Sequence, residues 1–337
     1  MEKQLEEADE TGVYQVSKRG KRKKLMQYLV QEGRTYRKRK EMAKCMAENQ
    51  GAGPRKEEEE EQMKDIEEVK EWEIKDVARR SPASSANGAN DVPLRMVLTV
   101  NQAHPESLRE IFMNILRRGK HPEIWKDVDL VPIPKAKKKT YMSPKSWRPI
   151  HLLRVVSKPL ERIVLRCLQN TEGDEGRELG KTQFGSRRNR GTTDAMTAFM
   201  RWKQETRRRG HYQSVVVADI EVGFDKVDPS TLQDSPLDQN YIPWIKSWVR
   251  NRRMRIRING STDEQIYTTN QGIPQGSPLS PNLFCAHIKK VMGSRITDDG
   301  HSMKMVISYV EDAVICVSAK DRASLEEKAR EIWRNMR

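Results

Sequence analysis

Acidic residues that follow apolar stretches occur at two places in the second half of the chain. Asp219 comes directly after the β-branched run at residues 214–218, and Glu311 and Asp312 separate two further apolar stretches. Burying a carboxylate costs several kcal/mol unless it is paired or bound to a metal ion. Together the three carboxylates offer oxygen ligands for two Mg²⁺ ions about 3.5–4 Å apart, which is an arrangement for phosphoryl transfer. In the structural alternative, Asp219 caps a turn and the other two acids lie at a solvated hairpin tip.

A third segment, residues 271–281, is a turn with the sequence Gln-Gly-Ile-Pro-Gln-Gly-Ser-Pro-Leu-Ser-Pro. It runs into the apolar residues 283–286, so it is flanked by structure and is not a low-complexity linker. Gly276 has no side chain and allows the backbone to approach a ligand closely. We therefore expect this turn to contact a ligand.

The elements that must position these residues are short strands and a hairpin. Residues 214–218 predict a strand that ends at Asp219, and residues 304–317 predict a hairpin whose turn lies at 309–312. Apolar residues three and four positions apart predict helices at 107–116 and 155–168. Helices mixed with hairpins after residue 91 indicate an α+β domain.

Charge dominates residues 1–80. They include basic runs at 18–24 and 37–40 and five glutamates at 57–61, so we expect this part to be helical or disordered. The run at 18–24 indicates a nuclear-import signal or a phosphate-binding arm, and a solvated helix face is the structural alternative. Residues 81–90 are rich in Ser, Ala, Asn and Gly, which is typical of a linker.

The composition limits the classes of protein to which the chain can belong. The 63 Lys and Arg residues outnumber the 48 Asp and Glu residues, and the net charge of +15 favours a polyanionic partner such as nucleic acid. Excess charge also serves solubility alone. The four cysteines form no C-x-x-C pair, which argues against a zinc site and against a disulfide framework. No apolar run of about 18 residues occurs, so we expect a soluble intracellular protein with no membrane partner.

The acidic segments and the Gly- and Pro-rich turn occur in the order and approximate spacing of the reverse transcriptase palm. Asp219, followed five residues later by Phe224, resembles the first metal-binding motif of that family. This implies that Asp219 binds both metals and that the aromatic ring selects deoxynucleotides at the 2′ position. Tyr309, Glu311 and Asp312 resemble the Tyr-x-Asp-Asp box. The resemblance implies that the two acids are catalytic metal ligands and that Tyr309 contacts nucleic acid.

The turn at residues 272–281 resembles the family's template- and nucleotide-contacting motif. The resemblance implies that Gln275 and Gly276 position the nucleotide. It also implies that Ser277 and Pro278 contact nucleic acid.

Segments upstream resemble the fingers of the non-LTR (LINE-like) retrotransposon and group II intron branch. The segments at 130–139 and 147–153 imply that Lys135 and Arg148 approach the incoming triphosphate, which suits an ammonium and a planar guanidinium. A basic surface hairpin is the structural alternative. Residues 183–195 resemble the pre-palm segment and imply template contacts by Arg187, Arg188 and Arg190. The resemblance covers residues 65–337.

The sequence departs from the family pattern at three positions. Glu311 stands where the family has the first Asp of its acidic pair, Asn90 stands where Asp is common, and Glu221 replaces a usual Lys. The extra methylene of Glu311 displaces the carboxylate by about an ångström, and a misplacement of that size reduces a rate by roughly 10²-fold. We therefore expect reduced activity.

The sequence predicts an α+β right-hand polymerase whose palm is an antiparallel sheet with helices on one face. The expected parts are a charged extension at 1–64, fingers and pre-palm at 65–212, and a palm at 213–337. The chain ends shortly after the hairpin. We therefore expect no thumb and interpret the chain as a truncated, partly degenerate copy of a retrotransposon reading frame.

The predicted function is RNA-directed DNA polymerisation. The expected reaction is attack of a primer 3′-OH on the α-phosphate of a deoxynucleotide, with two Mg²⁺ ions as cofactors and Mn²⁺ as their substitute. The expected partners are an RNA template, a DNA primer and dNTPs. One alternative is a catalytically dead, nucleic-acid-binding remnant, and another is an intron maturase, which would carry a basic helical domain after the palm. The resemblance implies the nucleus, with the mitochondrion as the alternative compartment.

Overall fold

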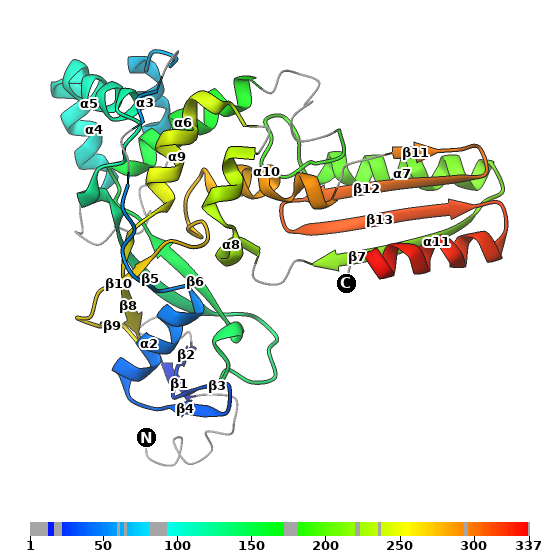
Figure 1. Ribbon diagram of the computed structural model, residues 1–337, viewed down its shortest axis with the longest axis horizontal. Coiled ribbons are helices and arrows are strands. Elements are labelled where there is room, and N and C mark those ends of the chain that lie inside the picture. The colour runs from blue at the N-terminus through cyan, green and yellow to red at the C-terminus, as the bar shows by residue number, and fades with distance from the viewer. Residues whose placement is uncertain are drawn as a thin grey trace. The chain divides into compact units, whose positions relative to one another are not determined.

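The computed structural model describes residues 13–16, 22–58, 61–63, 66–80, 93–171, 181–219, 223–234, 237–292 and 296–335. The chain divides into two compact units, and Figure 1 labels the elements of both. Unit 1 comprises Met1–Ile163, Phe224–Ser230 and Gln239–Pro278, and unit 2 comprises Val164–Gly223, Thr231–Asp238 and Leu279–Arg337. The expected mixture of helices and antiparallel sheets is confirmed.

Unit 2 is built on a four-stranded antiparallel sheet. In spatial order its strands are β11 (Ile296–Asp298), β12 (Ser302–Tyr309), β13 (Asp312–Ala319) and β7 (Tyr212–Asp219). The hairpin expected at 304–317 is formed by β12 and β13, and the strand expected before Asp219 is β7. Both predictions are confirmed. β-branched residues in short runs bounded by turns were the signal, because such residues suit a pleated, half-buried surface.

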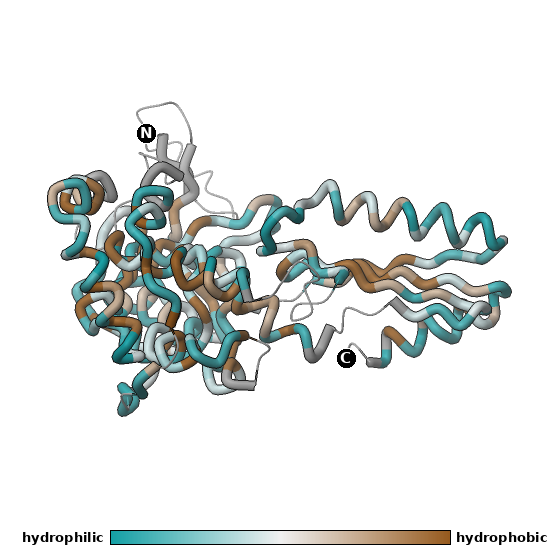
Figure 2. Tube along the Cα trace, turned by 90° about the horizontal axis from the view of Figure 1, so that it is seen from above, coloured by the Kyte–Doolittle hydropathy of each residue, from teal (hydrophilic) through white to brown (hydrophobic). Residues whose placement is uncertain are grey.

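Helices cover both faces of this sheet. Val306, Ile315 and Val317 pack with Leu325 and Ile332 of α11 (Arg322–Asn335). The intervening strand residues, among them Met305, Ile307 and Cys316, pack instead with Trp202 of α7 (Thr192–Arg208). Figure 2 shows the apolar strands between two helices. The expectation of helices on one face is therefore wrong, because neighbouring residues of β12 and β13 are both apolar and point to opposite faces.

Unit 1 contains a five-stranded mixed sheet. Its main order is β10 (Tyr267–Thr269), β8 (Arg252–Ile258), β5 (Asp127–Pro134) and β6 (Trp147–Leu152), with β9 (Ser261–Thr262) beside β8. Strand β8 alternates arginine with apolar residues, and Met254, Ile256 and Ile258 are buried in the core. On the other face the fully buried carboxylate of Asp129 pairs with Arg255, which lies opposite it in the parallel β5–β8 register. This ion pair favours the observed register.

The N-terminal region contributes to that core. Helix α2 (Arg39–Asn49) buries Met42, Cys45 and Met46 against apolar residues of β8, and the short strands β3 (Leu29–Gln31) and β4 (Arg34–Tyr36) precede it. Strands β1 (Val13–Val16) and β2 (Arg22–Leu25) pair with each other. The expectation of helix or disorder missed these strands, because charged residues conceal the few apolar positions that are buried. The expected linker at 81–90 and residues 18–21 of the basic run lie outside the described residues.

The remaining helices connect the strands of both units. The helices expected at 107–116 and 155–168 are confirmed as α5 (Pro105–Arg117) and α6 (Ser157–Thr171). The others are α3 (Glu71–Arg80), α4 (Leu94–Ala103), α8 (Gly223–Lys226), α9 (Ile242–Val249) and α10 (Ser280–Met292). All four cysteines are free and buried. Within the described ranges, no helix is long and apolar enough to cross a bilayer.

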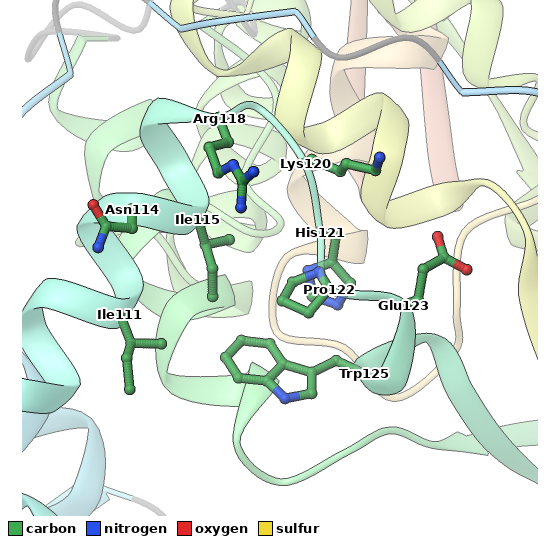
Figure 3. Close-up of a pocket in the computed structure, with 9 residues that line it drawn as sticks. All are labelled: Ile111, Asn114, Ile115, Arg118, Lys120, His121, Pro122, Glu123 and Trp125. Atoms are coloured by element: carbon green, nitrogen blue, oxygen red, sulfur yellow. The ribbon is translucent and has the colours of Figure 1, made fainter.

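An apolar cavity of about 380 Å³ lies in unit 1, where α5 ends (Figure 3). Ile111, Ile115 and Trp125 line it, and so does His121, which is 1% exposed. The His121 ring makes edge contacts with Trp125 and Trp244. Burial, with a smaller contribution from the charge of Lys126, lowers the pKa of His121 to about 3. His121 is therefore neutral at physiological pH.

Candidate active site

Two of the predicted metal ligands lie directly opposite each other in unit 2. Asp219 ends β7, Asp312 begins β13, and the two residues are partners in the antiparallel register. Opposed residues in such a pair have Cα atoms about 4.5–5.5 Å apart and side chains on the same face. Both aspartates are exposed. Like charges in this arrangement repel, so a bound cation would relieve a cost that the fold itself imposes.

Glu311 lies in the hairpin turn, between the paired residues Tyr309 and Asp312. The backbone of Val310 has φ 57°. This left-handed conformation is rare for a β-branched residue and costs on the order of 1–3 kcal/mol. Glu311 is half-buried, whereas Asp312 is exposed. The structure thus distinguishes the two acids of the box: Asp312 belongs to the sheet and Glu311 to a strained turn.

The loop at residues 182–185 contacts the tip of the β12–β13 hairpin. The backbone N–H of Phe184 donates to the carbonyl oxygen of Ser308 at 2.9 Å, and the N–H of Ser308 donates to that of Thr182 at 3.0 Å. Gly185 is buried against the turn, and a Cβ atom there would lie 2.6 Å from the backbone nitrogen of Val310. Only glycine permits this approach. Residues 182–185 therefore help to fix the turn that carries Glu311.

The predicted template-contacting arginines follow this loop in unit 2. The guanidinium of Arg190 lies over the Phe184 ring, with its Cζ atom 5.7 Å from the ring centroid, and it donates to the carbonyl oxygen of Lys181. Arg187 is half-buried and donates to the carbonyl oxygen of Gln183 at 3.4 Å, and Arg188 is exposed. Tyr309 is 37% exposed. The structure thus brings Tyr309 and the loop that bears the arginines to one end of the β12–β13 hairpin.

The Gly- and Pro-rich turn lies in unit 1 beside the end of β6. The backbone N–H of His151 donates to the carbonyl oxygen of Gln275 at 2.7 Å, and the N–H of Gln275 donates to Nδ1 of His151 at 3.1 Å. A Cβ atom on Gly276, which has φ 135°, would lie 2.5 Å from the carbonyl oxygen of His151. The close approach expected at Gly276 is thus made to the protein's own backbone. Burial and the charge of Arg252 lower the pKa of His151 to about 3, so its ring is neutral and can accept this bond.

The other predicted nucleotide-binding residues also belong to unit 1. Arg148 is exposed on β6, opposite Ile133 of β5. Lys135 follows β5 and is half-buried, and its charge acts on Asp225. The carbonyl oxygen of Phe224 accepts from the backbone N–H of Ile273 at 2.8 Å. Phe224 is therefore tied to the Gly- and Pro-rich turn.

The predictions from sequence missed two buried acids that support this turn. Glu161 of α6 is fully buried, and its Oε2 atom accepts from the hydroxyl of Ser277 at 2.5 Å. Burial raises the pKa of Glu161, although the hydrogen bonds from Ser157, Ser277 and Trp248 act to lower it. Asp225, the second acid, follows Phe224 directly and is 9% exposed. The available signal was an acid directly after an apolar residue in each segment, at Leu160-Glu161 and at Phe224-Asp225.

The paired aspartates fit a divalent metal of the magnesium type. Carboxylate oxygens are the ligands that Mg²⁺ prefers, and one or two of them suffice when water and substrate phosphates complete its shell. Within the described part of the chain, no group of three or more His, Cys, Asp or Glu side chains is arranged to bind a metal. The fit therefore rests on the pair Asp219 and Asp312. Val217, on the same side of β7, is 75% exposed, so this part of the face is left open to a ligand.

Comparison with known proteins identifies the family. Residues 133–337 match the family described as reverse transcriptase (RNA-dependent DNA polymerase). The chain belongs to this family. Reverse transcriptases generally use divalent metal ions, which agrees with the carboxylate chemistry of Asp219 and Asp312.

Curated relatives are proteins of insect retrotransposons. The chain is 25% identical to the RNA-directed DNA polymerase from mobile element jockey of Drosophila melanogaster, over 74% of this chain and 27% of that protein. It is 28% identical to the putative 115 kDa protein in type-1 retrotransposable element R1DM of the same species, over 76% of this chain and 23% of that protein. It is 27% identical to the retrovirus-related Pol polyprotein from type-1 retrotransposable element R2 of Popillia japonica, over 58% of this chain and 27% of that protein. The chain thus spans roughly a quarter of the length of these relatives.

Proposed function

We propose that this chain carries out RNA-directed DNA synthesis, adding deoxynucleotides to the 3′-OH of a DNA primer on an RNA template. The observation that carries the proposal is the register pair of Asp219 and Asp312 in unit 2. Two carboxylates on one face of a sheet, at the ends of their strands, suit metal-assisted phosphoryl transfer. Membership of the reverse transcriptase family supports the same reaction.

In this proposal Asp219 and Asp312, with Glu311, hold two Mg²⁺ ions, for which Mn²⁺ can substitute. When bound, such ions stabilise the attacking and leaving oxygens of the displacement. The roles of the side chains in unit 1 follow from their chemistry. Lys135 and Arg148 bind the triphosphate, and Phe224, Gln275 and Gly276 position the nucleotide. The proposed template contacts are those of Arg187, Arg188, Arg190, Ser277, Pro278 and Tyr309.

The proposed organisation follows the resemblance to retrotransposon enzymes. Residues 65–212 act as fingers and pre-palm, residues 213–337 act as palm, and residues 1–64 form a charged extension. The net charge of +15 supports an RNA partner. We propose the nucleus as the compartment, as the resemblance to non-LTR retrotransposon enzymes implies. The family match does not favour the alternative of a catalytically dead, nucleic-acid-binding remnant.

Primer extension on an RNA template tests the proposed function. The native chain should extend a DNA primer with Mg²⁺ or Mn²⁺. Asp219→Asn should lower the rate by about 10²-fold or more, because it removes half of the paired charge at the site of phosphoryl transfer. Glu327→Gln is the matched control, since Glu327 is an exposed acid on α11 of the same unit. Equal rates for the native chain and Asp219→Asn would contradict the proposal.

A further inference from the structure

The carboxylate of Asp225 accepts hydrogen bonds from two side-chain amides in unit 1. Nε2 of Gln275 donates to Oδ1 at 2.9 Å, and Nε2 of Gln50 donates to Oδ2 at 3.1 Å. Gln50 and Asp225 are 4% and 9% exposed. The bond from Gln50 is therefore buried and that from Gln275 is partly buried. Removing one partner of such a bond leaves an unpaired polar group and costs about 1–3 kcal/mol. The orientation of each amide is accordingly well determined.

Backbone contacts place Asp225 against the same turn. The N–H of Gly272 donates to the carbonyl oxygen of Val227 at 2.8 Å, which complements the bond from Ile273 to Phe224. Gly272 has φ 68°, and a Cβ atom there would lie 2.7 Å from the carbonyl oxygen of Asp225. The backbone at Gly272 thus lies close to the backbone of Asp225. This contact holds the Asp225 side chain within reach of Gln275.

Two cations lie near the Asp225 carboxylate. Burial raises its pKa, while the amides of Gln50 and Gln275 and the charges of Lys135 and Arg252 act in the opposite direction. Arg252 is 3% exposed and donates to the carbonyl oxygens of Gln271 at 2.6 Å and Gly272 at 2.9 Å. The carboxylate thus lies beside the backbone of the turn, and the charge of Lys135, which we assign to the triphosphate, acts on it.

Both oxygens of the Asp225 carboxylate accept hydrogen bonds here, whereas a side-chain amide accepts at its oxygen and donates from its nitrogen. Asp225 consequently obliges Gln275 to turn its nitrogen inward. The Oε1 atom of Gln275 has no hydrogen-bond partner within the described residues, and the Gln275 side chain is half-buried. Oε1 is thus left to accept a hydrogen bond from a ligand.

We propose that Asp225 is a positioning residue for nucleotide binding, which fixes the Gln275 amide with its oxygen toward the nucleotide. The inference rests on the proposed function, in which Gln275 contacts the incoming nucleotide. Asp225 itself touches no substrate in this scheme. Its effect on the reaction passes entirely through the orientation of one amide.

The test measures KM for a dNTP and kcat in primer extension by the full chain. Asp225→Asn keeps the shape of the side chain, but its new amide nitrogen must face the amide nitrogen of Gln275 or of Gln50. Because both nitrogens are donors, one of these glutamine amides must turn over or lose its hydrogen bond. We expect KM to rise about tenfold, equivalent to about 1.4 kcal/mol, with little change in kcat. Asp225→Asn combined with Gln50→Glu should restore KM, because the introduced carboxylate can only accept, which directs the Asn oxygen back to Gln275.

Gln50→Met is the matched control, since it removes a bond to the same carboxylate without disturbing Gln275 and should leave KM unchanged. Thermal unfolding of each variant verifies that it is folded. A rise in KM that persists in the double variant, an equal rise in Gln50→Met, or an unchanged KM in Asp225→Asn would overturn the inference while the proposed function stands. Absence of extension by the native chain would instead overturn the proposed function, and the inference with it.

Discussion

At the scale of single residues, the type and spacing of the acids predicted a candidate site, but not how the backbone holds each acid. Asp219 ends its strand as expected, whereas its register pairing with Asp312 joins β7 to β13, and the predicted hairpin of β12 and β13 does not by itself determine that pairing. Glu311 differs, because it belongs to a turn whose preceding residue, Val310, has a left-handed backbone. No sequence pattern reveals that strain. The buried acids Glu161 and Asp225 were missed for a related reason, since only tertiary packing removes them from water.

Glu311→Asp should raise the rate of primer extension, up to roughly 10²-fold. Shortening the side chain by one methylene draws the carboxylate back toward the paired aspartates, and catalytic rates are sensitive to displacements of about an ångström. Initial rates under saturating dNTP measure the effect. A slower Glu311→Asp variant would show that the turn has adapted to glutamate.

At the scale of elements, the β12–β13 hairpin was predictable and its surroundings were not. Alternating and continuous apolar runs identify strands, but they do not tell which helix covers which face. Helix α7 packs on Met305, Ile307 and Cys316, and α11 packs on the opposite face. The contact between residues 182–185 and the hairpin tip joins segments distant in sequence, so it depends on tertiary structure. The same holds for the contribution of α2 to the core of unit 1.

Gly185→Ala should impair both folding and catalysis, because its Cβ atom would lie 2.6 Å from the Val310 nitrogen and 2.7 Å from the Val310 Cγ2 atom. The hairpin tip must shift to accept it. We expect a loss of about 1–3 kcal/mol in the free energy of unfolding. The rate of primer extension should also fall, since the hairpin tip carries Glu311. Denaturant unfolding and primer extension measure the two effects.

Gly191→Ala is the appropriate comparison for Gly185→Ala. A Cβ atom on Gly191 would meet only the Oδ2 atom of Asp194, at 3.8 Å, which is an ordinary contact. Both glycines belong to unit 2. Similar losses of stability and rate in the two variants would contradict the role assigned to the loop at 182–185.

At the scale of the whole molecule, charge and burial together determine how the chain responds to its surroundings. The net charge of +15 predicted a polyanionic partner, and family membership agrees with that prediction. Which histidines are buried could not be predicted from the sequence. Nothing in the sequence around His121 and His151 sets them apart, yet both are buried and their pKa values are lowered to about 3.

Stability should therefore fall as the pH is lowered from about 6.5 toward 3. In the unfolded chain histidine takes up a proton near pH 6.5, whereas the buried rings stay neutral, so the unfolded state binds more protons throughout this window. Each histidine should contribute a slope of up to about 1.4 kcal/mol per pH unit. His121→Phe keeps the ring against Trp125 and Trp244 and should flatten the slope. His301→Phe, at an exposed position, should leave it unchanged, and equal slopes in both variants would refute this account.

Binding of Mn²⁺ tests directly whether Asp219 and Asp312 form one divalent-metal site. The electron paramagnetic resonance signal of free Mn²⁺, followed during titration of the full chain, reports binding without requiring catalysis. We expect that the native chain depletes this signal and that Mg²⁺ competes. Combined Asp219→Asn and Asp312→Asn should abolish the effect, while Glu327→Gln should preserve it. Equal Mn²⁺ binding by the native chain and the double variant would contradict a metal site at Asp219 and Asp312.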